Sequence, residues 1–196
     1  MSQDGLSILI INGGVKFHGQ GGSLNAAVVE RMRAQLTGYG HKVVVTNVDD
    51  QWDAQEEGKK LLAADSVILQ FPGWWMGLPW QVKRYIDEVF MTDAVQPTDG
   101  RSRANRTHLY GSGGRFHDKT YMLSTTWNAP LEAFTEPLEF FEGKGFDAVA
   151  FPVHKAFEFL GMRAMPSFMI NDIFKNPTLE ADWVRLAAHL ERYYAR

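Results

Sequence analysis

Residues 7–25 read SILIINGGVKFHGQGGSLN, and this stretch decides the fold. It opens with an aliphatic run, 7–11, that has no polar alternation, which is typical of a strand buried on both faces of a parallel sheet. A loop with five glycines follows. Ser23 is then a candidate N-cap for a helix over 23–39, in which apolar residues recur at four-residue steps. The stretch predicts the strand–loop–helix unit of an α/β protein.

The rest of the chain repeats this alternation. Further strands are expected at 42–47, 66–71, 120–125 and 167–171, and helices over 53–63, 79–90 and 179–194. Alternating elements indicate right-handed βαβ units, and five strands favour a doubly wound, flavodoxin-like parallel sheet of order 2-1-3-4-5. We expect one domain over 1–196, interrupted by a polar excursion at 91–118 that is long for a structureless loop.

Composition excludes several classes of function. The 196 residues contain no cysteine, so disulfides, thiolate nucleophiles and cysteine-ligated metals are excluded. The net charge of -3 argues against nucleic-acid partners, which need a basic surface. No histidine has a metal-binding spacing, so no metal is expected. No apolar run reaches the ~20 residues of a membrane span, and the N-terminus lacks the features of a signal peptide, which predicts a cytoplasmic protein.

Three loops follow strands at their carboxyl ends. The glycine-rich loop leads to a helix N-terminus, whose free N–H groups suit an anion. Residues 72–80 hold three tryptophans, and Ser124–Pro130 adds Trp127. In the order 2-1-3-4-5 these loops converge at the switch point of the sheet. An anionic tail attached to a flat ring would satisfy all three, and a flavin nucleotide has that form. Each loop also has a simpler interpretation. The glycine-rich loop could lack a ligand, the tryptophans of 72–80 (Trp80 above all) could cap the core, and Ser124–Pro130 could be an ordinary turn.

Other charged residues are expected to have simpler roles. Glu56-Glu57 and Asp87-Glu88 are predicted to lie on solvated helix faces. The arginines of the excursion are expected in a solvated loop, with a contact to a nucleotide phosphate as the alternative. They are Arg101, Arg103, Arg106 and Arg115.

Several short strings together resemble the flavodoxin-like quinone reductase family. They are Asn12-Gly13, PGWWMG at 72–77, YGSGG at 110–114, TWNAP at 126–130 and His154-Lys155-Ala156. The likeness spans nearly the whole chain, and the two tryptophan strings are its most specific part. His18 departs from the enterobacterial pattern, in which an alanine stands at that position.

This resemblance implies a homodimer with FAD at each site, NADPH or NADH as the hydride donor and a quinone as the substrate. It implies that residues 20–25 hold the diphosphate, that 72–75 and 126–129 line the flavin, and that Tyr110 contacts the cofactor. The implied cofactor-binding residues are His18, Gln20, Gly21, Gly22, Ser23, Leu24, Asn25, Pro72, Gly73, Trp74, Trp75, Tyr110, Thr126, Trp127, Asn128 and Ala129.

The activity expected on this basis is two-electron reduction of quinones by a ping-pong mechanism. The flavin carries the hydride, so no side chain is required as an acid or a base. The excursion is expected to reach the partner subunit and help to close the site. Alternative hypotheses are an FMN-dependent azo or nitro reductase, a flavodoxin-type electron carrier and a flavin-free regulatory module.

Overall fold

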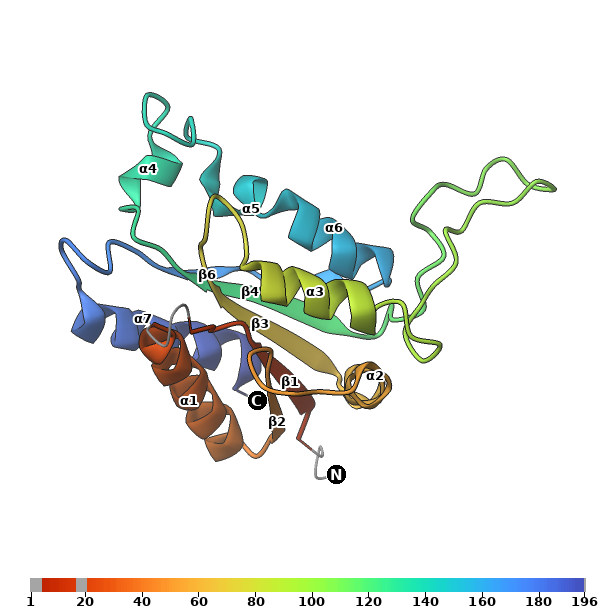
Figure 1. Cartoon of the computed structure of the whole chain (residues 1–196), viewed down its shortest axis with the longest axis horizontal. Coiled ribbons are helices and arrows are strands. Elements are labelled where there is room, and N and C mark those ends of the chain that lie inside the picture. Colours follow the sequence, from red (N-terminus) through yellow and green to blue (C-terminus); the bar gives the residue numbers. More distant parts are fainter. Residues whose placement is uncertain (1–4, 17–20, 196) are drawn as a thin grey trace.

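A parallel sheet forms the middle layer of the computed structural model, which describes residues 5–16 and 21–195 (Figure 1). Its order is β2-β1-β3-β4-β5, with β6 also paired to β4, and this confirms the predicted order 2-1-3-4-5. The strands are β1 (Ser7–Asn12), β2 (Lys42–Asn47), β3 (Ser66–Pro72), β4 (Thr120–Thr126), β5 (Arg163–Ala164) and β6 (Phe168–Ile170).

The expected fifth strand is divided into two segments. We predicted one strand over 167–171, whereas β5 and β6 both pair with β4 and are separated by residues 165–167. Pro166 lies in this gap. Because proline has no N–H to donate, it interrupts the ladder at that point.

Helices cover both faces of the sheet. α1 and α7 lie on one face, and α2, α3, α5 and α6 lie on the other (Figure 1). Alternate residues of each strand enter two separate cores: Ile8 and Ile10 pack beneath α1 and α7, and Leu9 and Ile11 pack on the opposite side. The helices are α1 (Ser23–Gly38), α2 (Ala54–Ala63), α3 (Trp80–Val89), α4 (Glu132–Thr135), α5 (Gly145–Val149), α6 (Phe151–Phe159) and α7 (Leu179–Tyr194).

α1 begins at Ser23 as predicted, but Ser23 is not its cap, and α2 and α3 each begin one residue later than predicted. Gly22, with φ of 79°, is the N-cap of α1, and Ser23 is already helical. Pro79 is the cap of α3 and precedes its first turn. The sequence pattern also missed α4, α5 and α6, because each is too short for a clear apolar repeat.

The prediction for Glu57 was wrong. Glu57 is 2% exposed, and its carboxylate accepts hydrogen bonds from Thr46 Oγ1 at 2.8 Å and Tyr85 Oη at 2.9 Å. Burial, and then the charge of Glu57, raise the pKa of Tyr85. Glu57 is buried because α2 packs this face against β2 and α3, a contact between distant segments that a local charge pattern does not reveal. Glu56 is exposed and pairs with Lys59, as expected of a solvated face.

Asp87-Glu88 behave as predicted, and Trp52 and Trp183 make packing contacts. Asp87 and Glu88 are exposed and form ion pairs along α3 with Lys83 and Arg84. Trp52 packs edge-to-face on Tyr85 with ring centroids 5.1 Å apart, and Arg31 stacks on Trp183.

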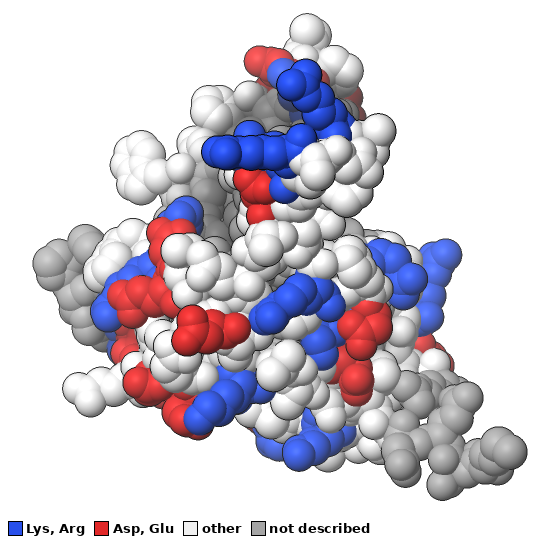
Figure 2. Space-filling model, turned by 90° about the vertical axis from the view of Figure 1, so that its right-hand side faces the viewer, with Lys and Arg blue, Asp and Glu red and all other residues white. Residues whose placement is uncertain are grey.

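The excursion at 91–118 forms an arm that projects from the body (Figure 1). Its two ends are anchored, because Val95 and Phe116 are buried in the core and Arg115 donates to the carbonyl of Ala94 at 2.7 Å. Arg101 pairs with Asp99, which lowers the pKa of that carboxyl group. Figure 2 faces this end of the molecule and shows Lys and Arg interspersed with Asp and Glu. Within the described residues, no helix is long and apolar enough to cross a membrane.

Candidate functional site

The glycine-rich loop forms a hollow of about 320 Å³ at the carboxyl ends of β1 and β2. Gly21, Gly22 and Ser23 line it together with the start of α1, and Lys16 lies on its rim. Among the described residues no side chain caps α1, and its first turn carries no acidic residue. The free N–H groups of this turn therefore remain available to an anion. Asp49 lies at the rim of the hollow and accepts the backbone N–H of Lys16 at 3.2 Å.

A chain of amide side chains supports this loop from below. Asn25 Nδ2 donates to Asn12 Oδ1 at 2.6 Å, and Gln70 Nε2 donates to Asn25 Oδ1 at 2.8 Å. Asn12 Nδ2 in turn donates to Asn47 Oδ1 at 2.8 Å. The strand register explains the arrangement, because Asn12 lies level with Asn47 on one side and with Gln70 on the other.

This network determines the path of the loop. Asn12 Oδ1 also accepts the backbone N–H of Gly14 at 3.0 Å. A Cβ at Gly14 would lie 2.8 Å from Asn25 Nδ2, so only glycine fits there. Asn25 itself is 2% exposed and its amide is bonded inward, to Asn12 and Gln70. Its side chain shapes the hollow from beneath.

An aromatic crevice of about 340 Å³ lies beyond β3 and β4. One wall is Trp127, which packs edge-to-face on Phe134 and Phe141 with centroids 5.2 and 5.9 Å away. Trp127 lies tightly against Gly73, where a Cβ would approach the indole to 2.3 Å. Several predicted residues line the crevice together: Gly73, Trp75, Trp127, Asn128 and Ala129.

Trp127 carries an unsatisfied donor. Its side chain is 5% exposed, and the buried indole N–H has no hydrogen-bond partner among the described residues. Buried polar groups in proteins are nearly always paired, so an orphaned donor beside a crevice favours a ligand with an acceptor atom.

A tight turn forms the opposite side of the crevice. Trp74 and Gly77 exchange two backbone hydrogen bonds of 2.8 and 3.0 Å, with Trp75 and Met76 at the tip. Both tip residues have positive φ, 44° and 63°, which matches a type I′ turn. Such turns favour Asn-Gly, so large side chains here are strained. Trp75 is 97% exposed, and strain of this kind at an exposed aromatic points to a functional role.

The remaining predicted residues have varied positions. Pro72 and Thr126 are the last residues of β3 and β4, and Gly73 N donates to Thr126 O at 2.8 Å. Leu24 and Trp74 are partly buried against the two cores. His18 and Gln20 lie outside the described residues. Trp80 is 65% exposed, so it does not cap the core.

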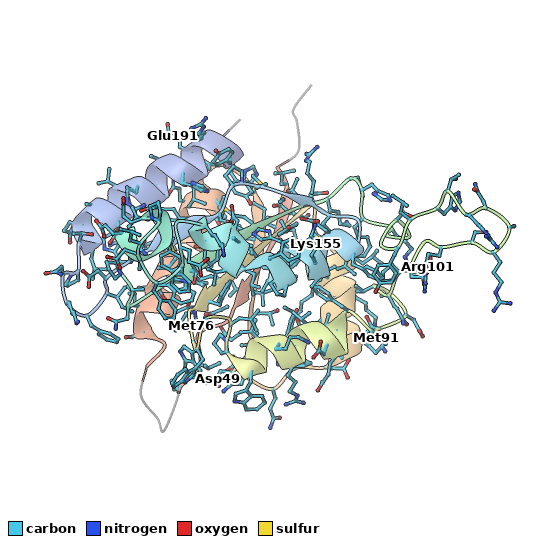
Figure 3. The ribbon with its side chains drawn as sticks, turned by 90° about the horizontal axis from the view of Figure 1, so that it is seen from above. Asp49, Met76, Met91, Arg101, Lys155 and Glu191 are labelled. Carbon is cyan, nitrogen blue, oxygen red and sulfur yellow. The ribbon has the colours of Figure 1, made fainter. Side chains whose placement is uncertain are left out.

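Tyr110 is separated from the other predicted residues. It lies on the arm, 70% exposed, and packs against Phe159 with centroids 5.3 Å apart. The arm lies away from the crevice, since Figure 3 shows Arg101 on the right of the molecule and Met76 to the left of its centre. Within one chain, Tyr110 cannot reach the crevice.

Sequence reasoning missed two parts of the site. The amides Asn12, Asn47 and Gln70 were not predicted as part of the site, although Asn12 directly follows one predicted strand and Asn47 ends another at the same level of the sheet. Gln70 lay hidden in an apolar run. Phe140 and Phe141, which complete the crevice, belong to a segment with no recognisable pattern.

The donor set fits a flavin nucleotide and does not fit a metal ion. Among the described residues, no cluster of His, Asp and Glu could hold a metal. The hollow at the helix N-terminus suits phosphate groups, and the crevice suits a flat ring that offers an acceptor to Trp127.

Comparison with known proteins agrees with the fold. The model of a flavodoxin-like fold family matches residues 7–196. The chain is 43% identical over 191 residues to the NADPH:quinone oxidoreductase MdaB of Haemophilus influenzae, covering 96% of this chain and all of the relative. An NADPH-quinone reductase structure from P. pentosaceus has a TM-score of 0.67 at 15% identity, covering 97% of this chain and 98% of that chain.

A further solved structure is the general stress protein 14 of Treponema denticola in complex with FMN. It superposes with a TM-score of 0.60 at 16% identity, covering 96% of this chain and 95% of that chain. From the family match over 7–196 and the near-complete alignment with MdaB, the chain belongs to the flavodoxin-like fold family and is a homologue of that quinone oxidoreductase.

Proposed function

We propose that the protein is a flavin-dependent NAD(P)H:quinone oxidoreductase. The observation that carries this proposal is the pairing of a helix N-terminus with an aromatic crevice; among the residues that the structure describes, neither that N-terminus has a side-chain cap nor the Trp127 N–H a partner. The two features follow neighbouring strands of the sheet, where ligands of this fold bind. The identity of 43% with MdaB over 96% of the chain supports the same activity.

We propose FAD as the cofactor. In this proposal the diphosphate occupies the hollow formed by 21–25, with His18 and Gln20 from the adjoining loop. The ring occupies the crevice formed by 72–75 and 126–129. The FMN bound to general stress protein 14 makes FMN the alternative. Release of the flavin by heat, followed by mass spectrometry, distinguishes the two, and FMN as the only flavin would contradict FAD.

When bound, the flavin would accept a hydride from NADPH or NADH and pass two electrons to the quinone. The chain supplies the surroundings. Trp127 would donate its indole N–H, which has no partner among the described residues, to an acceptor of the bound flavin, and the exposed side chains of Trp75 and Met76 offer an apolar surface for the second substrate. In the part of the chain that the structure describes, Asn128 is the polar side chain of the crevice, and no acid or base lines it.

We also propose that the donor and the quinone use the same place in turn, which is a ping-pong order. Initial rates measured over a grid of both substrates should give parallel double-reciprocal lines. Intersecting lines would show that both substrates bind together. The same measurements with NADPH and NADH give the preference between the two donors.

We propose a homodimer in the cytoplasm, with the arm reaching the partner's crevice. Leu109 and Tyr110 are 73% and 70% exposed on the arm, an unusual amount of apolar surface for a projecting loop. Light scattering after size-exclusion chromatography tests the dimer. The variant Tyr110→Ala should lower flavin affinity without changing the thermal stability of the flavin-free protein.

The central experiment is NADPH oxidation by the purified protein with menadione. A yellow protein that turns over many equivalents supports a reductase. A yellow protein without turnover supports an electron carrier, and a colourless protein that ignores added FAD supports a flavin-free module. A preference for azo or nitro compounds over quinones would favour the alternative reductase class.

A further inference from the structure

A second cavity, of about 420 Å³, adjoins the aromatic crevice. It lies between α3 on one side and α5 and α6 on the other. Its walls are formed by Phe71, Ile86, Phe146, Val149, Val153 and Ala156. Met76 and Trp127 line both this cavity and the crevice, so these two side chains form the boundary between them.

The chemistry of the cavity restricts what it can hold. Its charged lining residues, Lys83 and Asp87, form an ion pair with each other at the surface, with side chains 60% and 59% exposed. The walls therefore offer hydrocarbon and aromatic surface with few polar partners. The volume lies within the ~300–1,000 Å³ typical of small-molecule sites. A flexible aliphatic group suits such a cavity, whereas a polar or charged group would lose its hydration without replacement.

Met76 is suited to control passage between the two spaces. Its side chain is 47% exposed and sits at the tip of the strained turn. Methionine is unbranched and adopts many shapes at low cost, so it can move aside for a chain. In Figure 3 Met76 lies to the left of the centre, away from Arg101 and the arm.

We propose that this cavity binds the aliphatic side chain of the quinone substrate while the quinone ring occupies the crevice. The inference rests on the proposed function and narrows its substrate class to quinones that carry an alkyl or isoprenoid tail. The tail would pass between Met76 and Trp127 and lie along Val149 and Val153.

The test compares two quinones that differ only in the tail: 2,3-dimethoxy-5-methyl-1,4-benzoquinone with hydrogen or with a decyl chain at position 6. Each buried methylene favours binding by about fourfold, so partial burial of the chain suffices for an effect of about tenfold or more. We expect kcat/KM to be at least about tenfold higher for the decyl quinone, mainly through KM. Quenching of tryptophan fluorescence without NADPH should show the same preference in Kd.

Two variants test whether the preference for the decyl quinone arises in the cavity. Val153→Phe and Ala156→Leu each fill part of it and should remove most of the decyl preference. Their kcat/KM for the tail-free quinone should stay within about twofold. Val184→Phe is the matched control, since Val184 is 70% exposed on α7 at the opposite face of the sheet. Two filling variants guard against the failure of one to fold, which circular dichroism detects.

The outcomes separate this inference from the proposed function. Turnover of the tail-free quinone with no gain from the decyl chain overturns the inference and leaves the reductase intact. No turnover of either quinone contradicts the proposed function and the inference with it. If Val153→Phe lowers both activities equally and converts a dimer into a monomer, the cavity is covered by a second copy of the chain, and the inference is wrong.

Discussion

Two loops border the same edge of the sheet, the glycine-rich loop after β1 and the tryptophan turn after β3. The glycine loop is held from inside, by the amides of Asn12 and Asn25, and five of its residues are glycine. The tryptophan turn is held by its backbone, through the two hydrogen bonds between Trp74 and Gly77. Its side chains are left outside, where Trp75 is almost fully exposed.

The difference suggests that the two loops bind in different ways, one through its backbone and the other through its side chains. A loop that binds through its backbone N–H groups needs a fixed backbone conformation, which the hydrogen bonds of the buried amides supply. A turn that binds by aromatic surface needs free side chains, which a backbone-held turn provides. Three experiments change residues of the two loops or their supports, and a fourth changes a contact elsewhere; they run from the largest expected effect to the smallest.

Asn25→Leu should have the largest effect. It removes the bonds from Asn25 to Asn12 and Gln70 and leaves Gln70 Nε2 buried without a partner. A loss of about 3 kcal/mol of unfolding free energy is expected, because each buried unpaired group costs about 1–3 kcal/mol. Chemical denaturation measures it, and flavin affinity should fall too. Ala27→Leu, at an exposed position on the same helix, is the control. Unchanged affinity would show that the network does not shape the loop.

Gly73→Ala tests the packing of Gly73 against Trp127, at the base of the tryptophan turn. The new Cβ would lie 2.3 Å from the indole of Trp127, so the tryptophan wall must move. Overpacking of this kind costs about 1–3 kcal/mol. We expect a clear drop in melting temperature and at least a tenfold loss of kcat/KM with menadione. Gly77→Ala provides the matched control, since nothing lies within 4 Å of its Cβ position. Equal effects of the two changes would contradict a role for the Gly73–Trp127 contact.

Replacing Trp75-Met76 by Asn-Gly should separate stability from function. Both positions have positive φ, which Asn-Gly adopts readily. The relief of strain should stabilise the protein by about 1 kcal/mol. Quinone KM should rise severalfold, because the apolar surface is lost. A gain in stability with unchanged KM would show that the exposed side chains take no part in binding.

A polar contact away from both loops gives the smallest effect. His154 Nε2 lies 3.2 Å from Asp147 Oδ1, and this hydrogen bond is the main cause that lowers the pKa of the Asp147 carboxyl group. Since the folded state binds that proton less readily, the contact stabilises the protein above the ordinary Asp pKa of about 3.9. The contribution is lost as the pH falls through the lowered pKa.

Melting temperatures at pH 7 and at pH 3 provide the measurement. Asp147→Asn should lower the value slightly at pH 7 and by a smaller amount at pH 3. Asp87→Asn, on the surface of α3, is the control, and its effect on the melting temperature should not show a comparable difference between the two pH values. An identical loss at both pH values would mean that the carboxylate charge is irrelevant.

Sequence reasoning predicted the elements with strong local patterns. The run 7–11 and the helix 179–194 are examples, because unbroken aliphatic residues and a clear helical repeat each reflect burial of one chain segment. It did not predict the short α4–α6 region or the division of the last strand at Pro166. In these segments the conformation depends on neighbours in space more than on local preference.

The sequence by itself determined the sheet order, the position of the glycine loop and the gathering of aromatics at one edge, because these follow from periodicity, glycine content and strand topology. Only the tertiary structure decided that Asn25 faces inward, that Glu57 is buried, that Trp127 separates two cavities and that Tyr110 lies beside Arg101 on the arm, away from the crevice. Each of these depends on contacts between residues distant in the chain, and such contacts leave no local pattern.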